Sequence, residues 1–337
     1  MRVFQIQDEW GFDHLQIASR PAPKPGPGQI LIAMKASSVN YRDLVVPKRG
    51  YGSFTGTLPL IPLSDGVGEI VELGAGVIRF KVGERVCPCF MQKWTAGEPS
   101  LERMTSTLGG PIDGTMTELM CLPEDGVVSV PDYLSNEEAA TLPCAALTAW
   151  SALSTYDRIA PGNRVLVQGT GGVALFALQI AKLQGAHVTI ISSSDEKIVR
   201  AKRLGADAAI NYRSTPEWAK ASRDITGGAG FDHILELGGE TTLPQSLRCI
   251  RPGGTISMIG VLSGGTMLAP LGLVVTRQVR LQGITVGHRD GFGAMMRAFA
   301  QHKVKPVIDR TFRFEQLKEA MAYLESGAHF GKVCISH

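Results

Sequence analysis

The chain has 337 residues, 44% of them apolar and 19% charged, so it is long enough to bury a large core and to form two domains. Its 34 basic and 31 acidic residues give a formal net charge of +3, a balance that argues against a nucleic-acid or membrane partner. No apolar run reaches the roughly 18–20 residues of a membrane span, and the N-terminus lacks a signal peptide's apolar core, so we expect a cytoplasmic protein with six reduced cysteines.

Short strand-like pieces, separated by proline and glycine, fill the first part of the chain. They include QILIAMKASSV, GVGEIVELGAG and GERVCPC. This pattern predicts a mainly β domain over residues 1–130.

From about Asn136 the pattern changes to alternating strands and helices, which is typical of a parallel sheet covered by helices. We expect six strands, at residues 165–167, 188–191, 208–211, 233–236, 255–260 and 280–286. Helices are expected between them at 174–183, 196–204, 216–225 and 242–249. Residues 131–286 are therefore predicted to form an α/β domain with a doubly wound parallel sheet of the Rossmann type.

A glycine-rich turn follows the first of these strands, where Gly169, Gly171 and Ala174 form a G-x-G-x-x-A pattern. Gly169 permits a tight turn, Gly171 lets the backbone approach a pyrophosphate, and Ala174 allows the helix to pack closely on the strand. The strand, turn and helix context favours a dinucleotide site over a glycine turn that serves only chain geometry. The residues predicted to cradle the pyrophosphate are Gly169, Thr170, Gly171, Gly172 and Val173.

The remaining segment, residues 287–337, contains two amphipathic helices and a final strand, KVCIS. Six segments of the chain are distinctive: VNYRDL (39–44), PLSDGVGEIVELGAGV (62–77), FKVGERV (80–86), LPCAALTAW (142–150), AKRLGADAAINYR (201–213) and HFGKVCI (329–335). Together they resemble the medium-chain dehydrogenase/reductase superfamily over nearly the whole chain. The resemblance implies a GroES-like substrate domain, completed by the C-terminal segment, with hydride transfer in a cleft beside the nucleotide domain.

This superfamily divides into zinc alcohol dehydrogenases and zinc-free quinone or enone reductases. At the family's metal positions the chain has Asn40 in place of a cysteine and Ser64 in place of a histidine, and only Cys144 keeps a potential ligand. A catalytic zinc needs three protein ligands, and the pair Cys87 and Cys89 does not close a structural zinc site. The resemblance therefore favours the zinc-free, zeta-crystallin-like quinone oxidoreductase branch, with no metal ligand.

The dinucleotide is predicted to be NADPH, with NADH as the alternative. An NAD site usually has an acidic residue about 20 residues past the glycine turn, and the resemblance puts Ser193 at that position. Lys197 and Tyr212 match positions that hold the 2′-phosphate in NADPH-dependent relatives. In a purely structural alternative, Asp195 is the N-cap of the next helix and Lys197 is a solvated charge in its first turn.

Other cofactor contacts are expected from the resemblance and from strand ends, where ligands bind in this architecture. Thr148 matches a position that contacts the nicotinamide, and Lys332 resembles a tail lysine that reaches the cofactor in some relatives. Gly238, Gly260 and Val261 follow predicted strands. The alternatives are a packing role for Thr148, a strand-edge charge for Lys332 and simple turns for the two glycines.

Two residues are predicted to be catalytic. The Asn40 amide can donate to a developing enolate oxygen, and the Tyr51 phenol can orient the substrate or supply a proton. Asn40 in a turn and Tyr51 covering the cleft are the structural alternatives.

We therefore predict an NADPH-dependent, zinc-free reductase of quinones or α,β-unsaturated carbonyl compounds. The alternatives are an alcohol dehydrogenase and a non-catalytic NADPH-binding protein of the crystallin or sensor type. A homodimer is expected, because the last sheet strand, in VVTRQVRLQGITV, looks long and apolar enough to pair across a two-fold axis.

Overall fold

The computed structural model describes residues 1–266 and 269–337, and the chain divides into two compact units. Unit 1 comprises Met1–Leu147 and Val286–His337, and unit 2 comprises Thr148–Thr285. Within the described residues no helix is long and apolar enough to cross a membrane.

The first unit extends further than the predicted boundary at residue 130. Helix α3 (Asn136–Ala140) packs against strands β3 (Gln29–Val39) and β4 (Asp65–Leu73), and this packing keeps the segment up to Leu147 in unit 1.

Unit 2 contains, within its described residues, a six-stranded parallel sheet in the order β10-β9-β8-β11-β12-β13. Its strands are β8 (Arg164–Gln168), β9 (His187–Ser192), β10 (Ala208–Asn211), β11 (Phe231–Glu236), β12 (Ile250–Met258) and β13 (Arg280–Gly283). This order is that of a Rossmann-type sheet, in which the direction of winding reverses between β8 and β11. The predicted doubly wound fold is confirmed.

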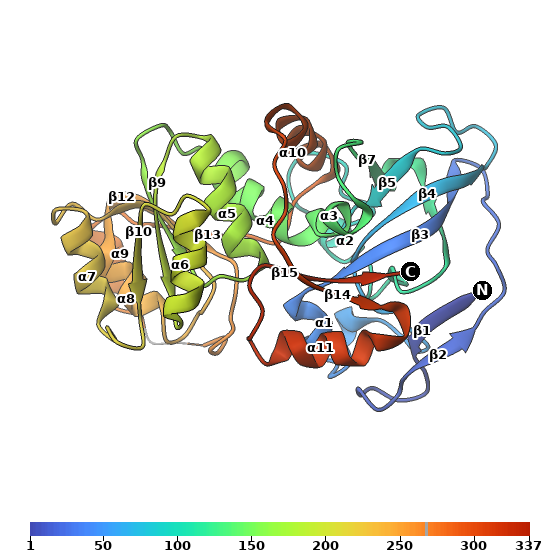
Figure 1. Ribbon diagram of the computed structural model, residues 1–337, viewed down its shortest axis with the longest axis horizontal. Coiled ribbons are helices and arrows are strands. Elements are labelled where there is room, and N and C mark those ends of the chain that lie inside the picture. Colours follow the sequence, from blue (N-terminus) through green and yellow to red (C-terminus); the bar gives the residue numbers. More distant parts are fainter. Residues whose placement is uncertain (267–268) are drawn as a thin grey trace. The chain divides into compact units, whose positions relative to one another are not determined.

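Helices cover both faces of this sheet, α5 and α6 on one and α7, α8 and α9 on the other (Figure 1). They are α5 (Gly172–Leu183), α6 (Asp195–Arg203), α7 (Trp218–Ile225), α8 (Leu243–Cys249) and α9 (Leu271–Thr276), and α4 (Leu147–Trp150) begins at the boundary between the units. Apolar residues of α7, α8 and α9 form one core with those of the strands, which is the burial that stabilises a sheet between helices.

The last strand of this sheet is shorter than predicted. The sequence suggests a strand over 280–286, but β13 ends at Gly283, and Val274 before it belongs to α9 and packs against the core. Val286 has φ of +51°, which a β-branched residue rarely adopts and which is incompatible with extended backbone. The prediction of a long apolar strand, on which the expected homodimer was based, is therefore wrong. Strand β13 nevertheless lies at the edge of the sheet.

Unit 1 is mainly β, as predicted. Its described residues form a seven-stranded sheet in the order β14-β15-β3-β4-β5-β7, with β6 paired to β3, and a two-stranded sheet of β1 and β2. The further strands are β1 (Arg2–Ile6), β2 (Leu15–Ser19), β5 (Arg85–Pro88), β6 (Leu119–Pro123), β7 (Val127–Ser129), β14 (Ile308–Arg313) and β15 (Lys332–Ser336). The further helices are α1 (Tyr41–Val45), α2 (Leu101–Met104), α10 (Arg289–His302) and α11 (Leu317–Glu325).

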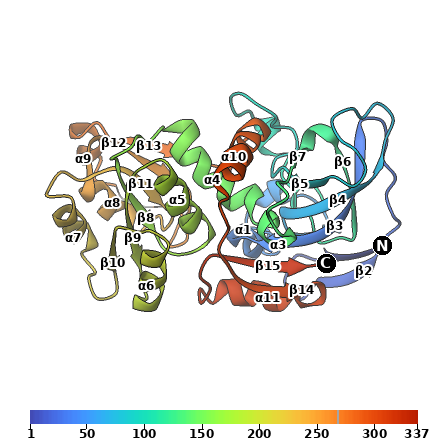
Figure 2. The ribbon, with the colours of Figure 1, turned by 45° about the horizontal axis from the view of Figure 1, so that its top comes forward.

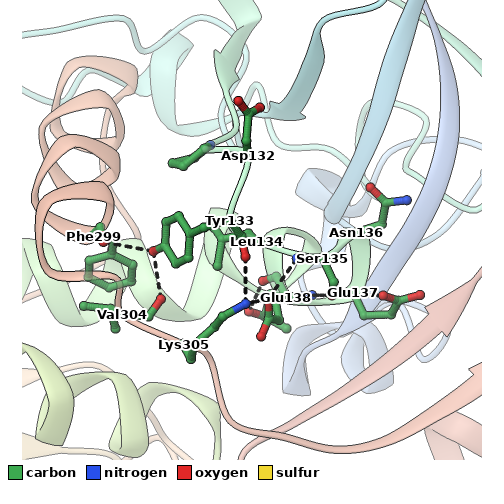
Figure 3. A network of polar contacts seen from close by, with 12 residues as sticks. Asp132, Tyr133, Leu134, Ser135, Asn136, Glu137, Glu138, Phe299, Val304 and Lys305 are labelled. Atoms are coloured by element: carbon green, nitrogen blue, oxygen red, sulfur yellow. Dashed lines mark hydrogen bonds and ion pairs between the residues drawn. The ribbon is translucent and has the colours of Figure 1, made fainter.

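The C-terminal segment returns to this sheet. Strand β15, predicted as KVCIS, lies between β14 and β3 (Figure 2). The end of α10 is held by Tyr133, whose hydroxyl bonds to the carbonyl oxygens of Phe299 at 2.9 Å and Val304 at 2.8 Å (Figure 3). Lys305 donates to the Tyr133 carbonyl at 2.7 Å and pairs with Glu138 at 2.6 Å, so the segment is tied to α3.

Candidate cofactor and substrate site

The glycine turn in unit 2 has the predicted strand, turn and helix around it. Gly169 follows β8 with φ of +79°, a value that favours glycine, and its N–H donates to the Ile191 carbonyl at 2.7 Å. Gly171 is the N-cap of α5, and no side chain caps this helix. Its first N–H groups are therefore available to an anion, as a pyrophosphate site requires.

Several other predicted cofactor residues lie at the same edge of the sheet. Ser193 follows β9, Tyr212 follows β10, Gly238 lies beyond β11, and Gly260 and Val261 lie beyond β12. The strands are parallel, so their carboxyl ends share one edge. The fold thus brings these residues to the edge where the glycine turn begins.

Thr148, also predicted to contact the cofactor, is buried in helix α4, which precedes the first strand of this sheet in the sequence.

The two glycines beyond β11 and β12 have a packing reason as well. A Cβ at Gly238 would lie 2.3 Å from Thr242 Oγ1, and one at Gly260 would lie 2.2 Å from the Leu237 carbonyl oxygen. Both distances are shorter than van der Waals contact allows. A tight loop beside the sheet therefore requires glycine at both positions, whatever ligand binds there.

Helix α6 is not capped by Asp195, as the structural alternative to a 2′-phosphate site had it. The N-cap is Ser194, whose Oγ accepts from the Lys197 N–H at 3.4 Å, and Asp195 is the first residue of the helix. The Asp195 carboxylate accepts instead from Asn211 Nδ2 at 2.8 Å. Ser193, at the position that is acidic in NAD sites, is therefore not the residue that caps this helix.

A buried polar network at the switch point was not predicted. Glu236, at the end of β11, and Gln168, at the end of β8, are almost fully buried, and Gln168 Nε2 donates to Glu236 Oε2 at 2.7 Å. Gln168 Oε1 accepts from the N–H groups of Leu237 and Gly238 at 3.0 and 3.1 Å. The sequence signal was a single carboxylate ending the apolar run HILE, next to a glycine loop.

A second set of polar residues lies in unit 1, where β3 ends and where β4 and β15 begin. The register of β15 on β3 pairs Val333 with Val39, which sets Lys332 opposite Asn40. The register of β3 on β4 pairs Ser38 with Asp65. Asn40, Asp65 and Lys332, which we call the strand-end cluster, are far apart in the sequence and adjacent in the sheet.

Lys332 lies at the centre of the strand-end cluster. Its ammonium donates to Asn40 Oδ1 at 2.6 Å and to the Val39 carbonyl at 2.9 Å, and it lies 3.8 Å from Asp65 Oδ2. Only 3% of Lys332 is exposed, so the alternative of a strand-edge charge is wrong. The other residues predicted to bind the cofactor lie in unit 2, whereas Lys332 belongs to unit 1.

The bond to Lys332 fixes the orientation of the Asn40 amide. An ammonium can only donate, so the atom facing it must be the amide oxygen, and the NH₂ group points elsewhere. Asn40 Nδ2 is buried and makes no well-formed hydrogen bond to the described residues, although the Asn40 side chain interacts with the Asp65 carboxyl and lowers its pKa. A buried donor that is only weakly satisfied is costly, and an acceptor on a ligand would satisfy it.

Two carboxyl groups interact with Asn40, Asp43 with its backbone and Asp65 with its side chain. Asp43 accepts from the Asn40 N–H at 2.7 Å, and burial raises the pKa of Asp43 to about 7. Burial also raises the pKa of Asp65, while the charge of Lys332 acts in the opposite direction. Ser64 donates to Asp65 at 3.1 Å. The region is thus rich in groups that can hold or transfer protons.

Charged residues near Asn40 affect the pKa values of Tyr51 and Cys144. Tyr51 is 44% exposed, and the Arg42 guanidinium lies 5.9 Å from its ring centre. Burial raises the pKa of Tyr51 and that of the Cys144 thiol. Both groups are therefore neutral and protonated near neutral pH.

The residues at the family's metal positions do not fit a zinc ion. Asn40 has its side-chain oxygen bonded to an ammonium, the Ser64 hydroxyl is bonded to Asp65, and only Cys144 of the three carries a side chain that commonly binds zinc. Catalytic zinc is held by three ligands drawn from thiolate, imidazole and carboxylate. In the described part of the chain no three His, Cys, Asp or Glu side chains are grouped to hold a metal.

Comparisons with known proteins agree with this architecture. The model of the alcohol dehydrogenase GroES-like domain matches residues 26–132, and that of the zinc-binding dehydrogenases matches residues 172–301. A zinc-type alcohol dehydrogenase-like protein of Schizosaccharomyces pombe is 45% identical, with 98% of each chain covered.

Solved structures are similar over the whole chain as well. A Sinorhizobium meliloti 1021 protein assigned as an alcohol dehydrogenase is 42% identical, with a TM-score of 0.94 over 100% of this chain and 98% of that one. An NAD-dependent alcohol dehydrogenase is 31% identical, with a TM-score of 0.90 over 100% of both chains.

Proposed function

The chain belongs to the medium-chain dehydrogenase/reductase superfamily, and from this premise we propose that it is a zinc-free reductase that uses NADPH to reduce quinones or α,β-unsaturated carbonyl compounds. The observation that carries the proposal is the strand-end cluster. A buried ammonium bonds to Asn40 at a metal position, and the buried amide beside it presents a donor that makes no well-formed hydrogen bond to the described residues.

Unit 2 would hold the cofactor at the carboxyl edge of its sheet. The uncapped N-terminus of α5 suits the pyrophosphate, and a serine rather than a carboxylate at 193 suits a 2′-phosphate, which a carboxylate would repel. Lys197 and Tyr212 lie in the adjoining first turn and strand end. Bound NADPH would supply the hydride and leave as NADP⁺.

Unit 1 would act on the substrate. Asn40 Nδ2 donates to the carbonyl oxygen as negative charge develops there, the same role that an oxyanion-hole amide performs. The Tyr51 phenol is protonated near neutral pH, as phenols ordinarily are, and it supplies the proton. One hydride and one proton together convert an enone to a saturated carbonyl compound, or a quinone to a hydroquinone.

An alcohol dehydrogenase is the second candidate, because the relatives are described by that name. The two candidates are separated by oxidation of NADPH and NADH with quinones, enones and aldehydes, with zinc measured on the same sample. We expect quinone or enone turnover with NADPH and less than stoichiometric zinc. Stoichiometric zinc, with alcohol oxidation that a chelator abolishes, would refute the proposal.

The choice of cofactor has its own test. S193D places a carboxylate where the 2′-phosphate is expected, and should lower NADPH affinity by about tenfold while sparing NADH. S19D, on exposed strand β2, adds the same charge in unit 1 and should leave both affinities unchanged. Equal effects of the two substitutions would count against the assignment.

We also propose a homodimer through edge strand β13, where Leu281 is 43% exposed. Light scattering that gives the mass of a single chain at micromolar concentration would contradict this assembly.

A further inference from the structure

We propose that the Lys332 ammonium takes the place of the catalytic metal ion, as a positioning residue that fixes the Asn40 amide with its NH₂ group toward the substrate. The inference rests on the proposed function for its kinetic consequence. Its structural part, a built-in cation at the metal position, is independent of the substrate.

The first support is the set of atoms around the ammonium. Among the described residues, the polar partners of Lys332 Nζ are three oxygen atoms: a backbone carbonyl, an amide carbonyl and a carboxylate. Such a set stabilises a cation, and a buried ammonium persists only when it is paired in this way. Two of these oxygens belong to Asn40, at one family metal position, and to Asp65, which follows Ser64 at the next.

The second support is the strand register. Lys332 is the first residue of β15, and the pairing of Val333 with Val39 holds it beside the end of β3. The lysine is therefore placed by the sheet of unit 1. A side chain that served only to reach a ligand elsewhere would not need both of these oxygens as partners.

The consequence concerns the amide. Without Lys332, Asn40 Oδ1 loses its cation and keeps only the capping interaction with the Asp43 backbone at the start of α1. The amide is then freer to rotate by half a turn about its last side-chain bond and present its oxygen to the substrate. An oxygen there would repel a developing oxyanion instead of donating to it. Lys332 thus decides which end of Asn40 the substrate meets.

The kinetic test separates this role from simple charge balance. K332M leaves Asp65 buried without its cation and is expected to lower the melting temperature, whereas K332M/D65N removes both charges together. We expect the double variant to regain stability but to keep a kcat at least about tenfold below wild type, with NADPH affinity within roughly twofold. K48M, on the exposed Lys48, is the control.

Recovery of kcat together with stability in K332M/D65N would show that Lys332 only balances charge, and would overturn the proposal. A loss of NADPH affinity with an unchanged kcat would overturn it too, since Lys332 would then be a cofactor ligand.

A second test does not depend on turnover. N40C/S64H supplies, with Cys144, three zinc ligands at the family positions, and N40C/S64H/K332M also removes the resident cation. After dialysis against zinc chloride, we expect about one zinc ion per chain only in the triple variant, because a second cation beside Lys332 is repelled. Equal zinc contents would overturn the proposal. If wild type reduces no quinone or enone, the proposed function fails while this test still decides the role of Lys332.

Discussion

Replacing Glu236 by glutamine tests whether the buried network between β8 and β11 holds the cofactor edge of unit 2 together. Glu236 Oε1 accepts from the N–H groups of residues 238–239, each at 3.1 Å, and from the Thr242 hydroxyl. Its Oε2 accepts from Gln168 at 2.7 Å and from Ser246 at 2.5 Å. All five groups act as donors, so the site is built for an acceptor on both sides.

The magnitude follows from the donors that an amide cannot serve. In E236Q the NH₂ group has its best position at Oε2, where the Ser246 hydroxyl can reverse and accept, but the Gln168 NH₂ cannot. If Gln168 turns over to accept, the Leu237 N–H loses its acceptor and the Gly238 N–H keeps only the oxygen of residue 236. About two buried hydrogen bonds fail in either arrangement, which costs about 2–4 kcal/mol.

The substitution Q168E offers a rescue. In Q168E/E236Q a carboxylate at 168 accepts from the loop N–H groups and from the new amide at 236, so every donor again has an acceptor. Q168E alone sets two buried carboxylates against each other and should also destabilise unit 2. The double variant should therefore recover at least about half of the stability that E236Q loses.

Hydrogen exchange of the β8 and β11 amides, read by mass spectrometry, measures the stability of this part of unit 2 directly. NADPH affinity on the same samples reports whether the loop beyond β11 has moved. E240Q, on the exposed side of that loop, is the matched control and should change neither. A double variant no more stable than E236Q would refute the account of donors and acceptors.

Three further outcomes are expected. The hydrogen bond from His233 lowers the pKa of Asp157 to about 2, below its usual 3.8. The stabilisation that the Asp157 carboxylate contributes is therefore complete above pH 3.8 and is lost as the pH falls through 2. In urea titrations the free energy of unfolding of D157N should be about 1 kcal/mol below that of wild type at pH 7 and equal to it below pH 2. Y133F removes the donor to two carbonyls at the end of α10 and should cost about 1–2 kcal/mol in calorimetry; an unchanged melting temperature would contradict that assignment. N40A should lower kcat by about 100-fold in steady-state kinetics with little change in NADPH affinity, and a normal kcat would remove Asn40 from the chemistry.

Local pattern was sufficient for much of the fold. The β-branched runs, the helical spacing between them and the glycines after the first strand predicted the parallel sheet and the turn at Gly169, because period and turn chemistry are properties of neighbouring residues. The last strand begins where it was predicted but ends three residues early, because Val286 has a positive φ that an apolar β-branched residue does not reveal in the sequence.

The residues at the metal positions, Asn40 and Ser64, could be read from the resemblance to the superfamily. The sequence did not reveal that an ammonium lies beside Asn40. Lys332 and Asn40 stand at opposite ends of the sequence, and only the antiparallel register of β15 on β3 places that ammonium on that amide. The sequence by itself determined the fold, because the period of apolar residues and the turn chemistry depend on neighbouring residues. The ammonium beside Asn40 was decided by the tertiary structure, because pairing between distant strands and burial set its partners.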